Sequence, residues 1–260
     1  MRTSKNYSNE LYQQFRYLAT WLPGTPLALG DIGVLKNNEF TKISNLSNEG
    51  IKFDELKDET KSDIDYSSKG AVSITTKASG VLAPQSSVLG EVDAGITVEF
   101  SKENAILFKA NETLSPSIKD QITLGKEILK RFKDGKWDKD WAVITELVVA
   151  KSGTILISSS SSGKIELKAK GKVEAAKLDI ADAGLGFELS FSKDLATKII
   201  AQESITPLFK ASKIKGRLLQ PRVFGMKKVR LMDLVTPEKA RSTNDLIYFG
   251  EADFENTDDE

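Results

Sequence analysis

The sequence predicts an α+β fold: a twisted, mainly antiparallel sheet with long amphipathic hairpins and a few packed helices. Two observations predict it. Apolar and polar residues alternate through two long blocks, residues 71–111 and 141–191, and a single amphipathic helical segment separates them. The strands follow one another through short turns and not through helices, which favours hairpins over a parallel sheet.

The region before the first block predicts one helix and one short hairpin. Residues 7–22 place Leu11, Phe15, Leu18 and Leu22 on one helical face. Residues 27–35 predict a short buried strand, and residues 40–43 a returning strand after an Asn-Asn turn. Residues 56–65 are polar and predict a loop or a surface helix.

The first block predicts a hairpin with a mobile connection. Residues 72–78 alternate, residues 80–87 connect, and residues 92–100 alternate again before a turn at 101–104. Residues 105–110 then return. The helical segment follows at residues 116–133, after a serine cap and with proline at its first position.

The second block predicts further strands. Residues 141–150 alternate, and the five serines at 158–162 predict a turn between strands. Alternation continues through residues 165–175, residues 193–202 predict a short helix or a bent strand, and a last strand lies near 208–215. We therefore divide the chain into a main domain, 1–215, and a C-terminal extension, 216–260, whose acidic end is predicted to be disordered.

Composition narrows the function. The chain has no histidine and no cysteine, which excludes disulfides, Cys/His zinc sites, a cysteine nucleophile and every histidine-based triad. Catalysis by carboxylates or lysine stays open, but no motif supports it. We expect a protein that is not an enzyme and that needs no cofactor or metal.

The net charge is zero, yet the charges are segregated. Residues 205–232 contain no acid, and the last ten residues contain no base. One interpretation is a solvated basic face with a disordered acidic tail. The other is an anion-binding surface that the tail can mask. The first residues lack the apolar core of a signal peptide, so we expect a cytoplasmic location in the inactive state.

The length of the alternating segments suggests a conditional pore-former. A membrane β-strand needs about 9–11 residues of two-residue alternation. Residues 90–101 and 164–175 have that length. A soluble antiparallel sheet with one wet face shows the same alternation, so periodicity alone leaves both interpretations open.

The order of elements resembles the pore-forming domain of the gasdermin family. The chain shares an N-terminal helix with basic residues and a short strand, Leu27-Ala28-Leu29-Gly30-Asp31-Ile32. It also shares two β-blocks around a helical segment and a final strand, over about residues 8–215. The large inhibitory domain of animal members has no counterpart here, so bacterial or fungal members are the better match.

The resemblance implies a protein that binds acidic lipids, forms a homo-oligomer and inserts β-hairpins at the inner face of the plasma membrane, in cell death or defence. The lipid-binding candidates are Arg2, Lys5, Arg16, Lys210, Lys213 and Lys215. The membrane-inserting candidates are Val92, Ile96, Val98, Phe100, Ile106, Phe108, Ile155, Ile157, Ile165, Leu167 and Val173. An activating protease is expected to cut the extension near Arg222, Arg230 or Arg241, where turn-forming residues gather.

The alternative is a soluble, non-enzymatic binding or scaffold protein. It would use the basic segment 208–230 for nucleic acid or for a protein partner. Phe209 and Phe224 are the only aromatic residues in that segment, which gives base stacking little support. Nucleic acid is therefore the less favoured partner.

Overall fold

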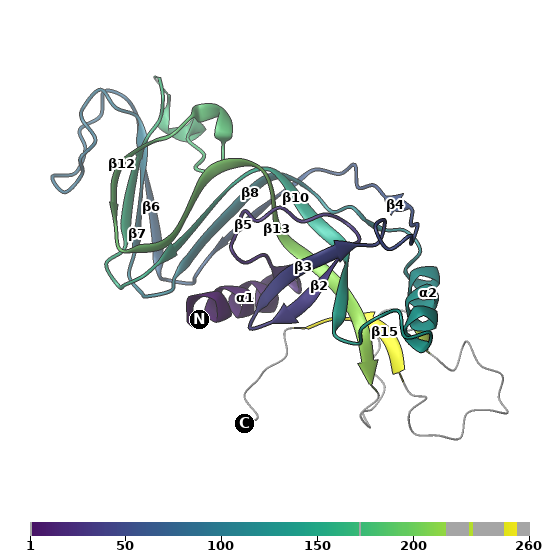
Figure 1. Cartoon of the computed structure of the whole chain (residues 1–260). Helices are drawn as coiled ribbons and strands as arrows, with labels where there is room; N and C mark the ends of the chain where they lie inside the picture. The colour runs from purple at the N-terminus through teal and green to yellow at the C-terminus, as the bar shows by residue number, and fades with distance from the viewer. Residues whose placement is uncertain (1, 172, 217–228, 231–246, 254–260) are drawn as a thin grey trace.

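The computed structural model describes residues 2–171, 173–216, 229–230 and 247–253 (Figure 1). In this part of the chain, two helices accompany a large curled antiparallel sheet and a smaller four-stranded one. The predicted α+β class is confirmed. The two sheets meet along a line of bends, and the small sheet rises from it at the left of Figure 1.

The helices are α1 (Arg2–Phe15) and α2 (Gln121–Lys133). The large sheet contains β1 (Leu18–Ala19), β2 (Asp31–Lys36), β3 (Glu39–Asn45), β4 (Glu55–Leu56), β5 (Ser62–Ser67), β8 (Ile106–Leu114), β9 (Ser117–Ile118), β10 (Trp141–Ser158), β13 (Leu195–Gly216), β14 (Val229–Arg230) and β15 (Ile247–Glu251). The small sheet contains β6 (Val72–Lys77), β7 (Gly95–Phe100), β11 (Lys164–Lys168) and β12 (Glu188–Lys193). Two short 3-10 turns, η1 (Ala175–Lys177) and η2 (Ala183–Leu185), lie between β11 and β12.

The same four lengths of chain build both sheets. β5 continues into β6, β7 into β8, β10 into β11 and β12 into β13, each through a short bend. The pairing order is β5-β8-β10-β13 in the large sheet and β6-β7-β11-β12 in the small one, so the order is repeated. We call these chain lengths the four folded strands.

The first helix begins and ends earlier than the sequence suggested, at residues 2–15 and not 7–22. Instead of continuing to residue 22, the chain leaves α1 at Arg16, whose φ of 60° is left-handed, and pairs β1 with β13. Tyr7, Leu11 and Phe15 pack on the large sheet, where they join the core made by Phe108 and its neighbours. The predicted apolar stripe was therefore correct for Leu11 and Phe15. It was wrong beyond the helix, where Leu18 is buried from a strand and Leu22 is 60 % exposed.

Two other boundaries were wrong. α2 begins at Gln121 and not at residue 116, because Asp120 caps it by accepting hydrogen bonds from the backbone N–H groups of Ile122 (3.1 Å) and Thr123 (2.9 Å). The segment predicted as a loop or surface helix, residues 56–65, contains most of the edge strand β5. Its inward side chains, Ile64 and Tyr66, are too few to give a strong apolar signal.

The C-terminal extension contributes to the main sheet. β15 pairs with the end of β13, and Phe249 and Ala252 are 4 % and 2 % exposed in the surrounding cores. The predicted division between residues 215 and 216 remains a prediction. Part of the extension nevertheless completes the edge of the sheet.

Candidate functional site

The central pair of the four folded strands keeps its register through the bend. Ile157 pairs with Ile106 before the bend, and Lys164 pairs with Glu99 after it. From Ile157 to Lys164 the chain covers the same number of residues as from Ile106 back to Glu99, so the register does not change. Hydrogen bonds also cross the bend itself, from the backbone N–H of Phe100 to the carbonyl of Gly163 (2.8 Å). The central pair is therefore one antiparallel ladder, folded once.

The outer pairs shift slightly at the bend. Ser67 pairs with Leu107 before the bend and Val72 pairs with Phe100 after it, so the register of these two strands shifts by two residues. On the other side, Ser158 pairs with Leu195 and Lys164 with Lys193, which is an offset of four residues. The longer strand accommodates the extra residues in the serine run.

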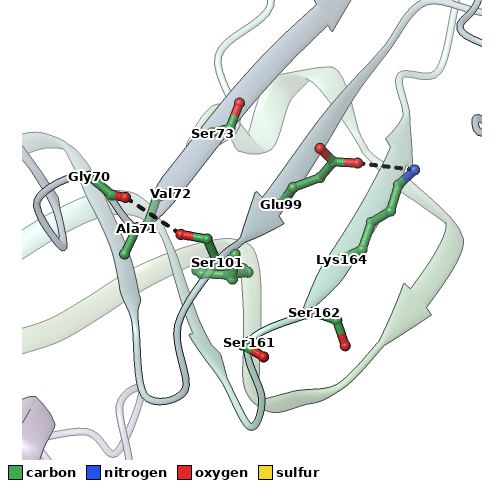
Figure 2. Close-up of a pocket in the computed structure, with 11 residues that line it drawn as sticks. Gly70, Ala71, Val72, Ser73, Glu99, Ser101, Ser161, Ser162 and Lys164 are labelled. Carbon is green, nitrogen blue, oxygen red and sulfur yellow. Dashed lines mark hydrogen bonds and ion pairs between the residues drawn. The ribbon is translucent and has the colours of Figure 1, made fainter.

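The serine run lies at the bend, as the predicted turn between strands. Its hydroxyl groups bind Asp194, the single residue between β12 and β13, whose φ is 53°. Ser160 and Ser162 each donate to an Asp194 carboxylate oxygen, at 3.1 and 3.0 Å. A shallow pocket opens beside them, crossed by the Lys164–Glu99 ion pair at 3.3 Å (Figure 2). Serine hydroxyl groups, a carboxylate and an ion pair thus gather at the bend.

Apolar side chains form continuous rows across the folded strands. In the large sheet, Tyr66 pairs with Phe108, Phe108 with Ile155, and Ile155 with Ile199. In the small sheet, Ile74 pairs with Val98 and Val98 with Ile165. All these residues share one face of the continuous ladder, because paired residues of antiparallel strands lie on the same side and faces alternate with a two-residue period.

The structure brings most of the predicted inserting residues together on that face. The strand predicted to return at residues 105–110 does not pair with the strand before it: β7 and β8 form one folded strand, as do β10 and β11. Four direct pairs connect these two folded strands: Ile96 with Leu167, Val98 with Ile165, Ile106 with Ile157, and Phe108 with Ile155. These side chains and Phe100 are at most 3 % exposed. The opposite face carries Thr97, Glu99, Lys109, Lys164, Glu166 and Lys168, interrupted by Leu107 and Leu156.

Two predicted members of the face do not belong to it. Val92 is 78 % exposed and precedes β7, because Asp93 closes a turn with Gly90. Val173 lies beyond the end of β11, after Gly171, whose φ of 96° breaks the extended backbone. The alternation of apolar and polar residues therefore continues in the sequence before the start of β7 and after the end of β11, where the chain is no longer a strand.

The apolar face has two different covers. In the large sheet it lies under α1, where the Phe15 ring centroid is 5.9 Å from that of Tyr66 and 6.2 Å from that of Phe108. In the small sheet it faces the other side of the large sheet, against Leu107 and Leu156. The bends turn the strands over, so equivalent positions point to different covers.

Helix α1 is also hydrogen-bonded to two bends. Glu10 accepts from the hydroxyl groups of Tyr66 and Ser68, both at 2.5 Å, and burial together with the bond to Glu10 raises the pKa of Tyr66. The Thr3 hydroxyl donates to the Asn104 side chain at 2.9 Å. The helix is therefore attached where the strands change sheets.

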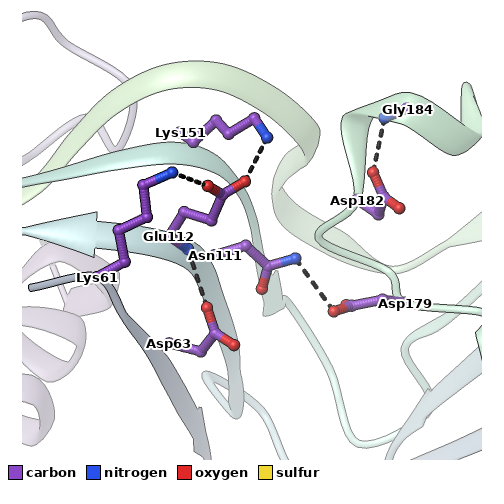
Figure 3. Close-up of polar contacts among 8 residues, drawn as sticks. All are labelled: Lys61, Asp63, Asn111, Glu112, Lys151, Asp179, Asp182 and Gly184. Atoms are coloured by element: carbon purple, nitrogen blue, oxygen red, sulfur yellow. Dashed lines mark hydrogen bonds and ion pairs between the residues drawn. The ribbon is translucent and has the colours of Figure 1, made fainter.

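A second polar cluster connects the sheets through the β11–β12 connection (Figure 3). Asn111 of β8 donates to Asp179 at 3.1 Å. On the same strand, Glu112 pairs with both Lys151 and Lys61, and these bonds lower its pKa to about 2. Of these contacts, the Asn111–Asp179 bond joins the large sheet to the β11–β12 connection, and the ion pairs of Glu112 lie within the large sheet.

The predicted basic residues fall into two groups. Arg2 and Lys5 begin α1. Arg16 lies just beyond its end, with its guanidinium 5.7 Å from the Tyr12 ring centroid. Lys210, Lys213 and Lys215 lie on β13. Tyr12 donates to Asp253 at 3.0 Å, and Asp253 pairs with Lys215 at 2.9 Å, so Asp253 joins the two groups.

One basic candidate has a half-buried partner. Lys210 lies 3.1 Å from both carboxylate oxygens of Glu146 and 4.4 Å from the Tyr17 ring centroid. Its charge is therefore largely matched within the fold. Of the predicted cleavage sites, Arg230 is in β14, which pairs with β15, while Arg222 and Arg241 lie outside the described residues.

Sequence reasoning missed Asp194 and the contacts of the β6–β7 loop, residues 78–94. No sequence pattern marked either, since their roles depend on residues far along the chain. Neither α1 nor α2 has the length and apolar content required to cross a membrane.

No protein-family model matches the chain. No curated protein matches it either.

Proposed function

We propose that this protein permeabilises membranes as a pore-former of the gasdermin type. A closed monomer binds acidic lipids, assembles with further copies and straightens its four folded strands into two membrane-spanning hairpins. The repeated strand order and the constant register of the central pair carry this proposal. They allow straightening without any exchange of strand partners.

The dimensions and faces of the strands support the proposal. A membrane β-strand needs about 9–11 residues with one apolar face. The stretches 95–114 and 141–168 exceed this length, even after the bend residues are set aside. Their paired apolar residues would meet lipid. The charged residues of the opposite face would line water.

The extension supports a closed resting state. Asp253 pairs with Lys215, so an acid from the extension neutralises a base on the surface that is proposed to meet lipid. A surface ion pair is worth only about 0–1 kcal/mol, so it would modulate lipid binding and not decide it. Because Phe249 belongs to a core, deletion of the whole extension would damage the fold. Cleavage within residues 217–246 is the better trigger to test.

The alternative, nucleic-acid binding by the basic segment, gains no support from the described residues. Lys210 and Lys215 of this segment pair with Glu146 and Asp253. These ion pairs compete with phosphate contacts, those of an acidic lipid headgroup as well as those of nucleic acid.

The decisive experiment is release of a trapped dye from vesicles. Intact chain and chain cleaved within residues 217–246 are each added to phosphatidylcholine vesicles with and without phosphatidylserine. We expect release from the acidic vesicles, strongest for cleaved chain, with ring-shaped oligomers in electron micrographs. Absence of release by both forms from both vesicles would overturn the proposal.

A further inference from the structure

The β6–β7 loop combines exposed aliphatic side chains with an unusually firm attachment. Val81, Leu82, Val88 and Val92 are 53 %, 79 %, 55 % and 78 % exposed. The other large exposed apolar residues of the described chain are scattered: Leu22, Ile43, Leu56, Ile74, Ile122 and Leu189. In Figure 1 the loop projects from the end of the small sheet that is farthest from the bends.

A buried lysine holds one side of this loop. Lys77, at the end of β6, is only 7 % exposed. Its ammonium group donates to the backbone carbonyls of Gly90 (2.9 Å), Glu91 (3.1 Å) and Asp93 (2.6 Å). A buried charge is costly without partners, and here three carbonyl groups of the loop supply them.

A buried glutamate holds the other side. Glu166 of β11 is fully buried, which would raise its pKa, but hydrogen bonds and Lys164 lower the pKa overall. Its carboxylate accepts from the hydroxyl of Ser87 (2.9 Å) and the backbone N–H of Val88 (2.8 Å). Lys164 contacts the same carboxylate at 2.8 Å. Two strands of the small sheet therefore fix the loop backbone while its aliphatic side chains stay in solvent.

We propose that the β6–β7 loop is a preformed docking wedge for a lipid bilayer, and that Lys77 and Glu166 maintain its shape. This inference rests on the proposed function for its setting, since the loop is the tip of the first hairpin. It adds that the closed chain already presents its lipid contact there. The interaction is hydrophobic, and it is separate from the basic residues of α1 and β13.

The chemistry of the loop favours lipid over a protein partner. Most of the binding energy at protein interfaces comes from a few residues, often tryptophan, tyrosine and arginine. Residues 78–94 contain none of these three. A projecting aliphatic loop does not need a complementary groove in a fluid hydrocarbon phase. Apolar area buried in the interfacial region provides binding energy in proportion to that area.

The test uses the intact, uncleaved chain and measures binding apart from leakage. Vesicles of phosphatidylcholine alone, and with phosphatidylserine, are floated with wild-type protein and with Leu82→Glu/Val92→Glu. The matched control is Ile43→Glu/Leu56→Glu, which alters two exposed residues of the large sheet. We expect binding to fall about tenfold or more for the loop variant and to stay near wild type for the control.

The attachment is tested by Lys77→Met. We expect faster amide exchange across residues 78–94 and weaker vesicle binding, with the far-ultraviolet circular dichroism unchanged. Full vesicle binding by Leu82→Glu/Val92→Glu and by Lys77→Met would overturn the proposed wedge. Absence of vesicle binding by wild type would overturn it as well. If wild type binds through the loop but never releases dye, the wedge stands and the pore-forming function fails.

Discussion

The large and small sheets contain the same four folded strands, but different structures cover their apolar face. In the large sheet the cover is α1, a separate element attached through Glu10, Thr3 and packed rings. In the small sheet the cover is the large sheet itself. Release of α1 would therefore expose only part of the face. Exposure of the rest requires the small sheet to swing away from the large one. Opening therefore has two separable barriers: the first is release of α1, and the second is separation of the two sheets.

The largest effect should come from locking the second barrier. Asn111 and Asp179 join the large sheet to the β11–β12 connection, and their side-chain atoms are 3.1 Å apart (Figure 3). Because the chain has no cysteine, a disulfide in Asn111→Cys/Asp179→Cys can form only between the two introduced residues. We expect no dye release when it is oxidised, and recovery on reduction.

The control for this lock is Ser62→Cys/Thr113→Cys. These hydroxyl groups are 3.0 Å apart on neighbouring strands of the large sheet, so a disulfide there does not join the two sheets. It should leave dye release near wild type. Mass spectrometry verifies both disulfides. Release by the oxidised Asn111→Cys/Asp179→Cys variant would show that the sheets need not separate.

The next effect should come from a charge on the apolar face. Val98 and Leu167 are fully buried, so a charge there would unfold the closed form. Ile74 is on the same face and pairs with Val98, yet it is 42 % exposed. A lysine on the lipid face of a barrel costs about 2–4 kcal/mol near the bilayer midplane. We expect Ile74→Lys to fold normally and to lose most dye release.

The matched control is the neighbouring residue. Ser73→Lys adds the same charge on the opposite, water-facing side of the strand. It should retain dye release, and any gain in binding to acidic lipid would apply equally to both variants. Equal release by the two variants would refute the assignment of faces.

These contrasts also explain what the sequence could and could not predict. The two-residue period identified Ile96, Val98, Ile165 and Leu167 as members of one face, because side-chain direction is a local property. It could not reveal that β7 and β8 belong to different sheets. Strand partners and register depend on long-range packing, which a single sequence does not encode in its local pattern.

The missed residues have the same explanation. Asp194 is significant because serines about thirty residues earlier in the chain donate to it. Lys77 resembled any polar residue of an alternating strand, but loop carbonyls surround its ammonium group. The wrong end of α1 arose because Leu18 continued the helical stripe by sequence while packing from β1.

A smaller effect should come from the first barrier. The Tyr7 hydroxyl is buried under α1 without a hydrogen-bond partner among the described residues, and burial raises its pKa. An unpaired buried polar group costs about 1–3 kcal/mol, so Tyr7→Phe should raise the free energy of unfolding by about 1 kcal/mol. Dye release should begin later, because α1 is held more firmly. Urea denaturation and release kinetics measure the two effects.

The control is Tyr12→Phe on the same helix. Its hydroxyl donates to Asp253 at 3.0 Å, so its removal cannot relieve an unpaired group. The stability of this variant should not rise. A destabilised Tyr7→Phe protein would show that the hydroxyl has a stabilising role in the closed form.

The smallest effect should be the acid dependence of the Glu112 cluster. Lys151 and Lys61 lower the pKa of Glu112 to about 2, from 4.5. A carboxylate with a depressed pKa stabilises the fold above its unfolded-state pKa, and that contribution is lost as the pH falls from about 4.5 to about 2. Glu112→Gln should therefore reduce stability slightly at pH 6 and flatten its decline between pH 5 and 2, measured by urea denaturation at each pH. The exposed Glu59→Gln serves as the control. If Glu112→Gln and wild type decline in parallel, the ion pairs of Glu112 with Lys61 and Lys151 do not stabilise the large sheet.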